Sequence, residues 1–123
     1  MDTLQKFNTT FIEFVDDLIR VAPNDADFQV YGMLMKSAIQ ARPNCMVHFF
    51  RESVSIPYED AILNRNEDFF VNHTFNDVTE GSKEATSLMN RIKSYWKDMS
   101  HEDKDIIWRY FRVLVLLERK LRT

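Results

Sequence analysis

The C-terminal segment Asp105-Ile-Ile-Trp-Arg-Tyr-Phe-Arg-Val-Leu-Val-Leu-Leu-Glu-Arg-Lys-Leu121 is the richest apolar stretch of the chain, and it gives the strongest indication of the fold. At helical spacing its apolar side chains form one stripe, made of Ile107, Tyr110, Phe111, Leu114, Leu117 and Leu121. Ile106, Val113 and Leu116 widen this stripe beyond what one neighbouring helix would cover. We therefore expect a central helix with other helices packed on several of its sides.

The rest of the chain predicts shorter helices that would surround this one. Apolar residues step by threes and fours over about residues 3–22, 25–42, 43–54 and from 82 to 97, with a short helix near 59–63. Pro23 and Pro57 interrupt the pattern, and residues 72–82 predict a long polar loop. Two glycines and three prolines in 123 residues favour helices over a sheet. The sequence thus predicts a single all-α domain over residues 1–123, with five to six helices and the C-terminal helix at the centre.

Several local features add detail to this prediction. Ser100 to Asp103 resembles a capping box, so the last two helices should form an antiparallel hairpin. The buried side of the helix over 25–42 is expected to carry Phe28, Tyr31, Leu34, Met35, Ala38 and Ile39. Gly32 in its middle suggests close helix packing, and His48 is expected to be partly buried with an ordinary hydrogen bond.

Composition sets limits on the class of protein. The richest apolar window is interrupted by Arg109, Arg112 and Glu118, so no membrane span is expected. The N-terminus shows no basic segment followed by an apolar one, and Cys45 has no second cysteine to pair with. These features predict an intracellular protein with a free, buried thiol.

The sequence contains no catalytic framework. It has no Gly-x-Ser-x-Gly, no glycine-rich phosphate loop and no Cys/His pattern of a metal site, so we expect no enzyme, no cofactor, no metal and no small-molecule substrate. One acidic segment leaves an alternative open, because Glu59, Asp60, Glu67, Asp68, His73 and Asp77 could offer oxygen ligands to a hard cation. Solvated helix caps are the simpler interpretation of the same residues.

Charge is distributed unevenly along the chain. Residues 1–82 contain 6 basic and 13 acidic groups, whereas residues 83–123 contain 10 basic and 6 acidic groups. Oppositely charged halves can attract each other within one fold or between copies. The alternative is that the basic C-terminal hairpin binds nucleic acid through Arg109 and Arg112, with Trp96 and Trp108 available for stacking.

The excess of apolar residues favours a protein-binding role. Several wide apolar faces in a small domain can leave a groove for a partner helix or for a second copy. Trp108 lies outside the main stripe of the last helix, where it is either a core contact or an interface anchor. The residues selected as partner-binding candidates are Trp108, Arg109, Arg112 and Trp96.

Three segments together resemble a known group of proteins. They are Phe11-Ile-Glu-Phe-Val-Asp-Asp-Leu-Ile-Arg-Val-Ala-Pro-Asn-Asp25, Pro57-Tyr-Glu-Asp-Ala-Ile-Leu-Asn-Arg-Asn-Glu-Asp-Phe-Phe70 and Ile107-Trp-Arg-Tyr-Phe-Arg-Val-Leu-Val-Leu-Leu117. The chain resembles small all-helical proteins encoded by large nucleocytoplasmic DNA viruses, including those of algae. This resemblance implies a viral origin and a role in the virion or on host or viral machinery, but it carries over no activity and no functional residues.

Overall fold

The computed structural model describes residues 2–67 and 83–122, and every regular element in these two ranges is helical. The elements are α1 (Thr3–Val21), α2 (Ala26–Ala41), α3 (Cys45–Phe50), the π-helical turn η1 (Arg51–Ser55), α4 (Ile56–Leu63), α6 (Lys83–Tyr95), the 3-10 turn η2 (Trp96–Asp98) and α7 (His101–Arg122). The predicted all-α architecture is confirmed. The loop predicted over residues 72–82 lies outside the described residues.

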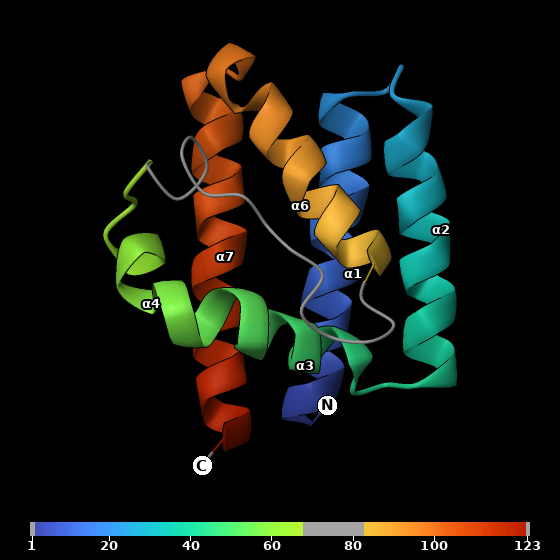
Figure 1. The fold of residues 1–123 in the computed structure, drawn as a ribbon, viewed down its shortest axis with the longest axis vertical. Helices are drawn as coiled ribbons and strands as arrows, with labels where there is room; N and C mark the ends of the chain where they lie inside the picture. The colour runs from blue at the N-terminus through green and yellow to red at the C-terminus, as the bar shows by residue number, and fades with distance from the viewer. Residues whose placement is uncertain (1, 68–82, 123) are drawn as a thin grey trace.

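The helices form two layers (Figure 1). In the first layer α1 lies between α7 and α2 and contacts both of them. The second layer, made of α6 and the α3–α4 segment, covers one face of the first. The two termini lie at the same end of the molecule, so α1 and α7 run antiparallel (Figure 1). No helix of residues 2–67 and 83–122 covers the face of α7 and α1 that points away from the second layer (Figure 1).

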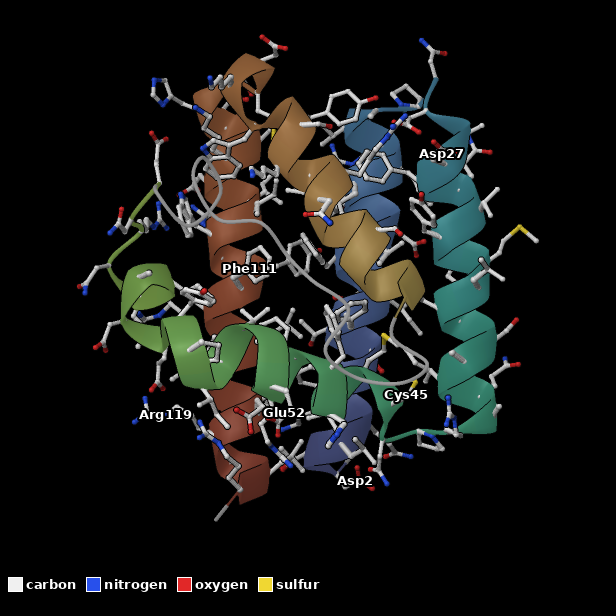
Figure 2. All side chains as sticks on the ribbon, viewed as in Figure 1. Asp2, Asp27, Cys45, Glu52, Phe111 and Arg119 are labelled. Atoms are coloured by element: carbon white, nitrogen blue, oxygen red, sulfur yellow. The ribbon has the colours of Figure 1, made fainter. Side chains whose placement is uncertain are left out.

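Aromatic side chains fill the space between the layers. Phe111 of α7 is fully buried, with ring centroids 5.4 Å from Phe14 and 5.9 Å from Phe50. Phe50 in turn contacts Phe7 at 5.7 Å. In Figure 2 Phe111 points from α7 into the interior, whereas Arg119 lies at the outer edge. Burying such a side chain stabilises a fold by roughly 1.5–3 kcal/mol. These rings join α7, α1 and α3 in one core.

Local capping determines where α1 and α2 begin. Asp2 and Gln5 form a reciprocal capping box at the start of α1. The carboxylate of Asp25 accepts the backbone N–H groups of Asp27 and Phe28, and α2 starts at the next residue. Pro23 lies between the two helices, and the helical pattern is interrupted there, as the sequence predicts.

The predicted break near Pro57 is a kink inside a helical segment. Helix α3, η1 and α4 follow one another without a gap from Cys45 to Leu63. Tyr58 alone has non-helical angles, with φ −133° and ψ 18°.

Arg51 of η1 donates to Glu118 of α7 at 2.8 Å, and Arg122 pairs with the same carboxylate at 2.9 Å. These two arginines balance the charge of a glutamate that is fully buried.

Some predictions about side-chain environment are wrong. Leu34 is 45 % exposed, although the pattern placed it on the buried side of its helix, and His48 is exposed rather than partly buried. Val113 and Leu116, expected to contact neighbours of α7, are also exposed. The physical reason is that α7 and α2 have neighbours on fewer sides than their apolar residues could cover.

The predicted hairpin of the last two helices is also wrong. Ser100 Oγ does accept the backbone N–H of Asp103 at 3.1 Å, so the expected cap of α7 is present. However, α6 diverges from α7 beyond the η2 connection and packs on α2 (Figure 1).

Candidate functional site

The two tryptophans selected from the sequence lie in the core. Trp96 is 1 % exposed and Trp108 is 5 % exposed, and their rings meet edge to face with centroids 5.4 Å apart. Lys104 Nζ lies 5.3 Å from the Trp96 ring centroid, within cation–π range. Of the two alternatives for Trp108, the core contact is therefore the one observed, and neither indole is placed to stack on a partner.

The two arginines selected with them do lie on the surface. Both are exposed side chains of α7. Arg109 pairs with Asp105, one turn earlier, at 2.9 Å, and its side chain remains 73 % exposed. Arg112 has no ion-pair partner among the described residues. Both positive charges are therefore accessible to solvent.

A groove runs between α1 and α7 beside these arginines. It has a volume of about 410 Å³ and is lined by Thr10, Glu13, Asp17, Ile106, Arg109, Tyr110 and Val113. The apolar lining residues come from α7, and α1 provides the carboxylates. We call this feature the α1/α7 groove. It combines an apolar floor with one acidic and one basic wall, which is the composition expected of a protein-binding surface.

Tyr110 holds the two walls of the α1/α7 groove together. Its hydroxyl donates a hydrogen bond of 2.5 Å to Asp17 Oδ2, and its ring lies 5.4 Å from Phe14. Partial burial is the main reason why the pKa of Tyr110 rises to about 12, and the bond to the Asp17 carboxylate adds to the effect. The tyrosine is thus neutral over the physiological range and acts as a donor.

Exposed apolar side chains continue beyond the groove. On α7, Val113 is 43 % exposed and Leu116, one turn from Arg112, is 40 % exposed. A second exposed group occupies the outer side of α2 and consists of Val30, Met33 and Leu34. Single exposed apolar residues are ordinary, but neighbouring ones on a helix face are typical of contact surfaces.

A different kind of site surrounds Asp25, at the junction of α1, α2 and α6. Its carboxylate accepts hydrogen bonds from Arg91 Nε at 2.9 Å and from the Tyr95 hydroxyl at 2.5 Å, in addition to the N–H groups that it caps. The bonds from Arg91 and Tyr95 lower the pKa of Asp25 to about 2. A fully bonded, ionised carboxylate is a structural anchor and has no proton to donate near neutral pH.

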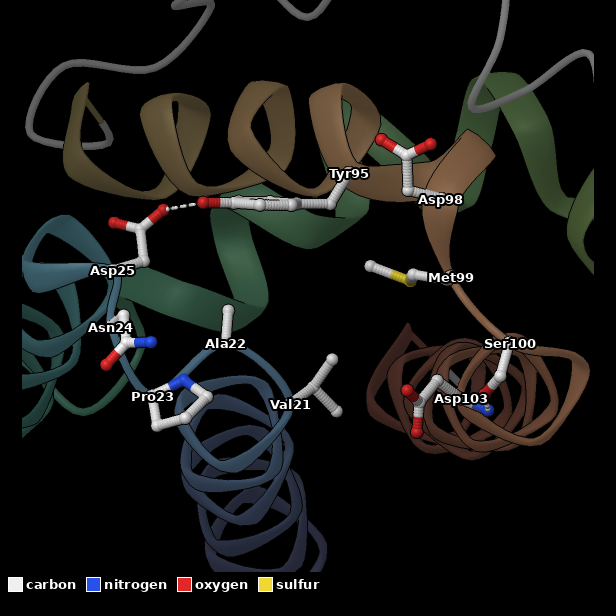
Figure 3. A pocket seen from close by; sticks show the side chains of 10 residues that line it. All are labelled: Val21, Ala22, Pro23, Asn24, Asp25, Tyr95, Asp98, Met99, Ser100 and Asp103. Atoms are coloured by element: carbon white, nitrogen blue, oxygen red, sulfur yellow. Dashed lines mark hydrogen bonds between the residues drawn. The ribbon is translucent and has the colours of Figure 1, made fainter.

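A pocket of about 380 Å³ adjoins Asp25 (Figure 3). One side is formed by Val21, Ala22 and Pro23 at the end of α1, and the other by Met99, Ser100 and Asp103 at the start of α7. Nothing in the sequence indicated that Arg91 and Tyr95 would reach the carboxylate of Asp25, more than sixty residues earlier in the chain. Their spacing of one helical turn on α6 is the only local signal that could have suggested a shared target.

The acidic segment proposed as an alternative metal site is only partly described. Glu59 pairs with Arg119 at 2.9 Å and Glu67 pairs with Lys104 at 3.5 Å. Asp68, His73 and Asp77 lie outside the described residues. Within residues 2–67 and 83–122, no three His, Cys, Asp or Glu side chains are grouped as metal ligands.

Cys45 is half-buried at the start of α3 (Figure 2). Burial raises the pKa of its thiol, which keeps it protonated and therefore weakly nucleophilic near neutral pH.

Comparison of the chain with protein-family models, with curated proteins and with solved structures finds no match. In the part of the chain that the structure describes, no helix has both the length and the apolar character that crossing a membrane requires.

Proposed function

We propose that this protein is a non-enzymatic helical interaction module that binds a protein surface through the α1/α7 groove. The observation that carries the proposal is the composition of this groove, which exposed Val113 lines together with the basic Arg109 and the acidic Glu13. Apolar centres with arginine and a charged rim are typical of protein interfaces. The resemblance to proteins of large DNA viruses suggests action in the virion or on host or viral machinery within the infected cell.

The buried charged groups support a binding role over a catalytic one. Asp25 accepts hydrogen bonds from Arg91 and Tyr95, and Glu118 forms ion pairs with Arg51 and Arg122. Each of these carboxylates joins helices from different parts of the chain. A general acid or base needs a pKa near the working pH, whereas the pKa of Asp25 is far below it.

Site-specific photocrosslinking tests this function. A photoreactive amino acid at Leu116, beside the groove, should form discrete adducts with a protein in cells that express the chain. The same amino acid at Lys97, an exposed position of η2, serves as the control. Adducts that form from Leu116, that are absent from Lys97, and that are lost on Val113→Asp substitution would support the proposal. Equal adduct patterns from both positions would refute it.

The second candidate is a nucleic-acid-associated protein that uses residues 83–123. Ion pairs weaken this candidate, because Arg91, Lys104, Arg109, Arg119 and Arg122 each lie near a carboxylate of the same chain. The observation in its favour is that Arg112 has no such partner among the described residues and is exposed.

Titration of a labelled short duplex DNA, at low and at physiological salt, tests the second candidate. Binding that weakens steeply with salt and falls on Arg112→Glu substitution would favour it. Absence of binding at both salt concentrations would exclude it.

A further inference from the structure

We infer that the occupant of the α1/α7 groove is a second copy of this chain, related to the first by a twofold axis that runs along the groove. The inference rests on the proposed function and specifies its partner. Three observations lead to this inference. They are the opposite charges on the two walls of the groove, the levels of these charges along the helices, and the apolar floor between the walls.

The antiparallel packing of α1 and α7 sets which residues lie at the same level. Tyr110 reaches Asp17 by a hydrogen bond, and Phe111 contacts Phe14. Residues around 109–113 of α7 therefore lie level with residues around 13–17 of α1. At this level the exposed charged residue of α1 that lines the groove is the acidic Glu13, and that of α7 is the basic Arg109. Asp16 is instead paired with Lys36 of α2, and Asp17 with Arg20.

A twofold axis along the groove uses this arrangement directly. Rotation about such an axis places α7 of one copy over α1 of the other and leaves every residue at its own level. Arg109 of each copy then faces Glu13 on α1 of the other copy. Because a twofold interface contains each contact twice, two sets of opposite charges meet across it.

The charges that would pair are free to do so. Glu13 is exposed and has no ion-pair partner among the described residues. Arg109 is bonded to Asp105, but both side chains reach solvent, and an exposed pair of this kind contributes only about 0.2–1 kcal/mol. Exchange of this bond for one across the interface therefore costs little.

The apolar floor of the α1/α7 groove would give the dimer its affinity, which the exposed charges do not provide. Val113 and Ile106 line the groove close to the proposed axis, so each would meet the same surface of the other copy. Leu116 extends the apolar area along α7. Apolar burial gives affinity, whereas the charges determine orientation and partner choice.

Charge exchange between the two walls tests the inference. Sedimentation equilibrium over a range of protein concentrations would measure the dimer dissociation constant of the full chain, Glu13→Arg, Arg109→Glu and the double variant. Each single variant places like charges together at two symmetric positions, and we expect dimerisation to weaken by about tenfold or more. The double variant restores opposite charges and should dimerise within about threefold of the original chain.

Lys97→Glu is the matched control, because it makes the same change of charge at an exposed position outside the groove. It should leave the dissociation constant unchanged. Circular dichroism of each variant would verify that the helices are retained.

A monomer at all concentrations would overturn the inference, as would a double variant that dimerises no better than the single ones. The proposed function would survive either outcome if photocrosslinking from Leu116 still gave an adduct with a different protein. Absence of both the dimer and the adducts would overturn the two proposals together.

Discussion

Replacing Asp25 by asparagine would remove the negative charge at the junction of α1, α2 and α6 while keeping an oxygen that can cap α2. The folded-state pKa of about 2, against an ordinary value of 3.8, measures how strongly the native state prefers the ionised form. One pKa unit corresponds to about 1.4 kcal/mol. We therefore expect Asp25→Asn to lower the free energy of unfolding by about 2 kcal/mol at neutral pH.

The pH dependence follows from the direction of this shift. Because the folded pKa of Asp25 is lowered, its contribution is complete above the unfolded pKa near 4 and is lost as the pH falls through about 2. The difference in unfolding free energy between the original chain and Asp25→Asn should shrink from about 2 kcal/mol at neutral pH to about 0.5 kcal/mol or less at pH 2.

Urea unfolding followed by far-UV circular dichroism, at both pH values, gives these free energies by linear extrapolation. Asp27→Asn is the control, because Asp27 lies 3.3 Å from the same Arg91 but its side chain is 55 % exposed. The Asp27→Asn substitution should lower the free energy of unfolding by less than about 0.5 kcal/mol. Asp25→Ala removes the cap as well and should cost about 1 kcal/mol more than Asp25→Asn. A deficit of Asp25→Asn that is equal at both pH values would refute the reasoning, because it would show that the charge of Asp25 contributes nothing.

Two further predictions concern α2 and the groove. Gly32→Ala would place a methyl group 3.0 Å from Val15 Cγ1. We expect this crowding to outweigh the gain in helix propensity and to lower the free energy of unfolding, measured with urea, by about 1 kcal/mol. An unchanged or higher free energy of unfolding would contradict this prediction. Tyr110, with a pKa of about 12, should ionise last in an ultraviolet titration, and its contribution to stability should be lost as the pH rises from about 10 to 12. The titration of Tyr110→Phe should lack this late component, and an unchanged curve would show the assignment to be wrong.

The positions of the helices could be predicted because their causes are local. The cap at Ser100, the interruption of the helices at Pro23 and the kink after Pro57 all depend on residues a few positions apart. The apolar spacing of the last helix was enough to predict part of its buried face, since Phe111 and Leu114 are fully buried.

The α1/α7 groove was predicted only on its basic side. Arg109 and Arg112 were selected from the sequence as exposed charges, but Glu13 and Asp17 come from α1 at the other end of the chain. The hydrogen bond from Tyr110 to Asp17 spans 93 positions, and no local pattern indicates such a pair. The sequence also left open whether Trp108 is a core contact or an interface anchor, and the structure shows that Trp96 and Trp108 pack on each other and are both buried.

The all-α class and the approximate helix boundaries follow from the sequence alone, because hydrogen bonding and capping within a helix are short-range. The sequence also gives most of the apolar face of each amphipathic helix. It does not show which apolar residues remain exposed, such as Leu34, Val113 and Leu116, and only the packing of the helices reveals them. A helix with apolar residues on most of its sides has no single preferred direction. Its buried side is set by the neighbours that pack on it, and those neighbours are brought there by distant parts of the chain.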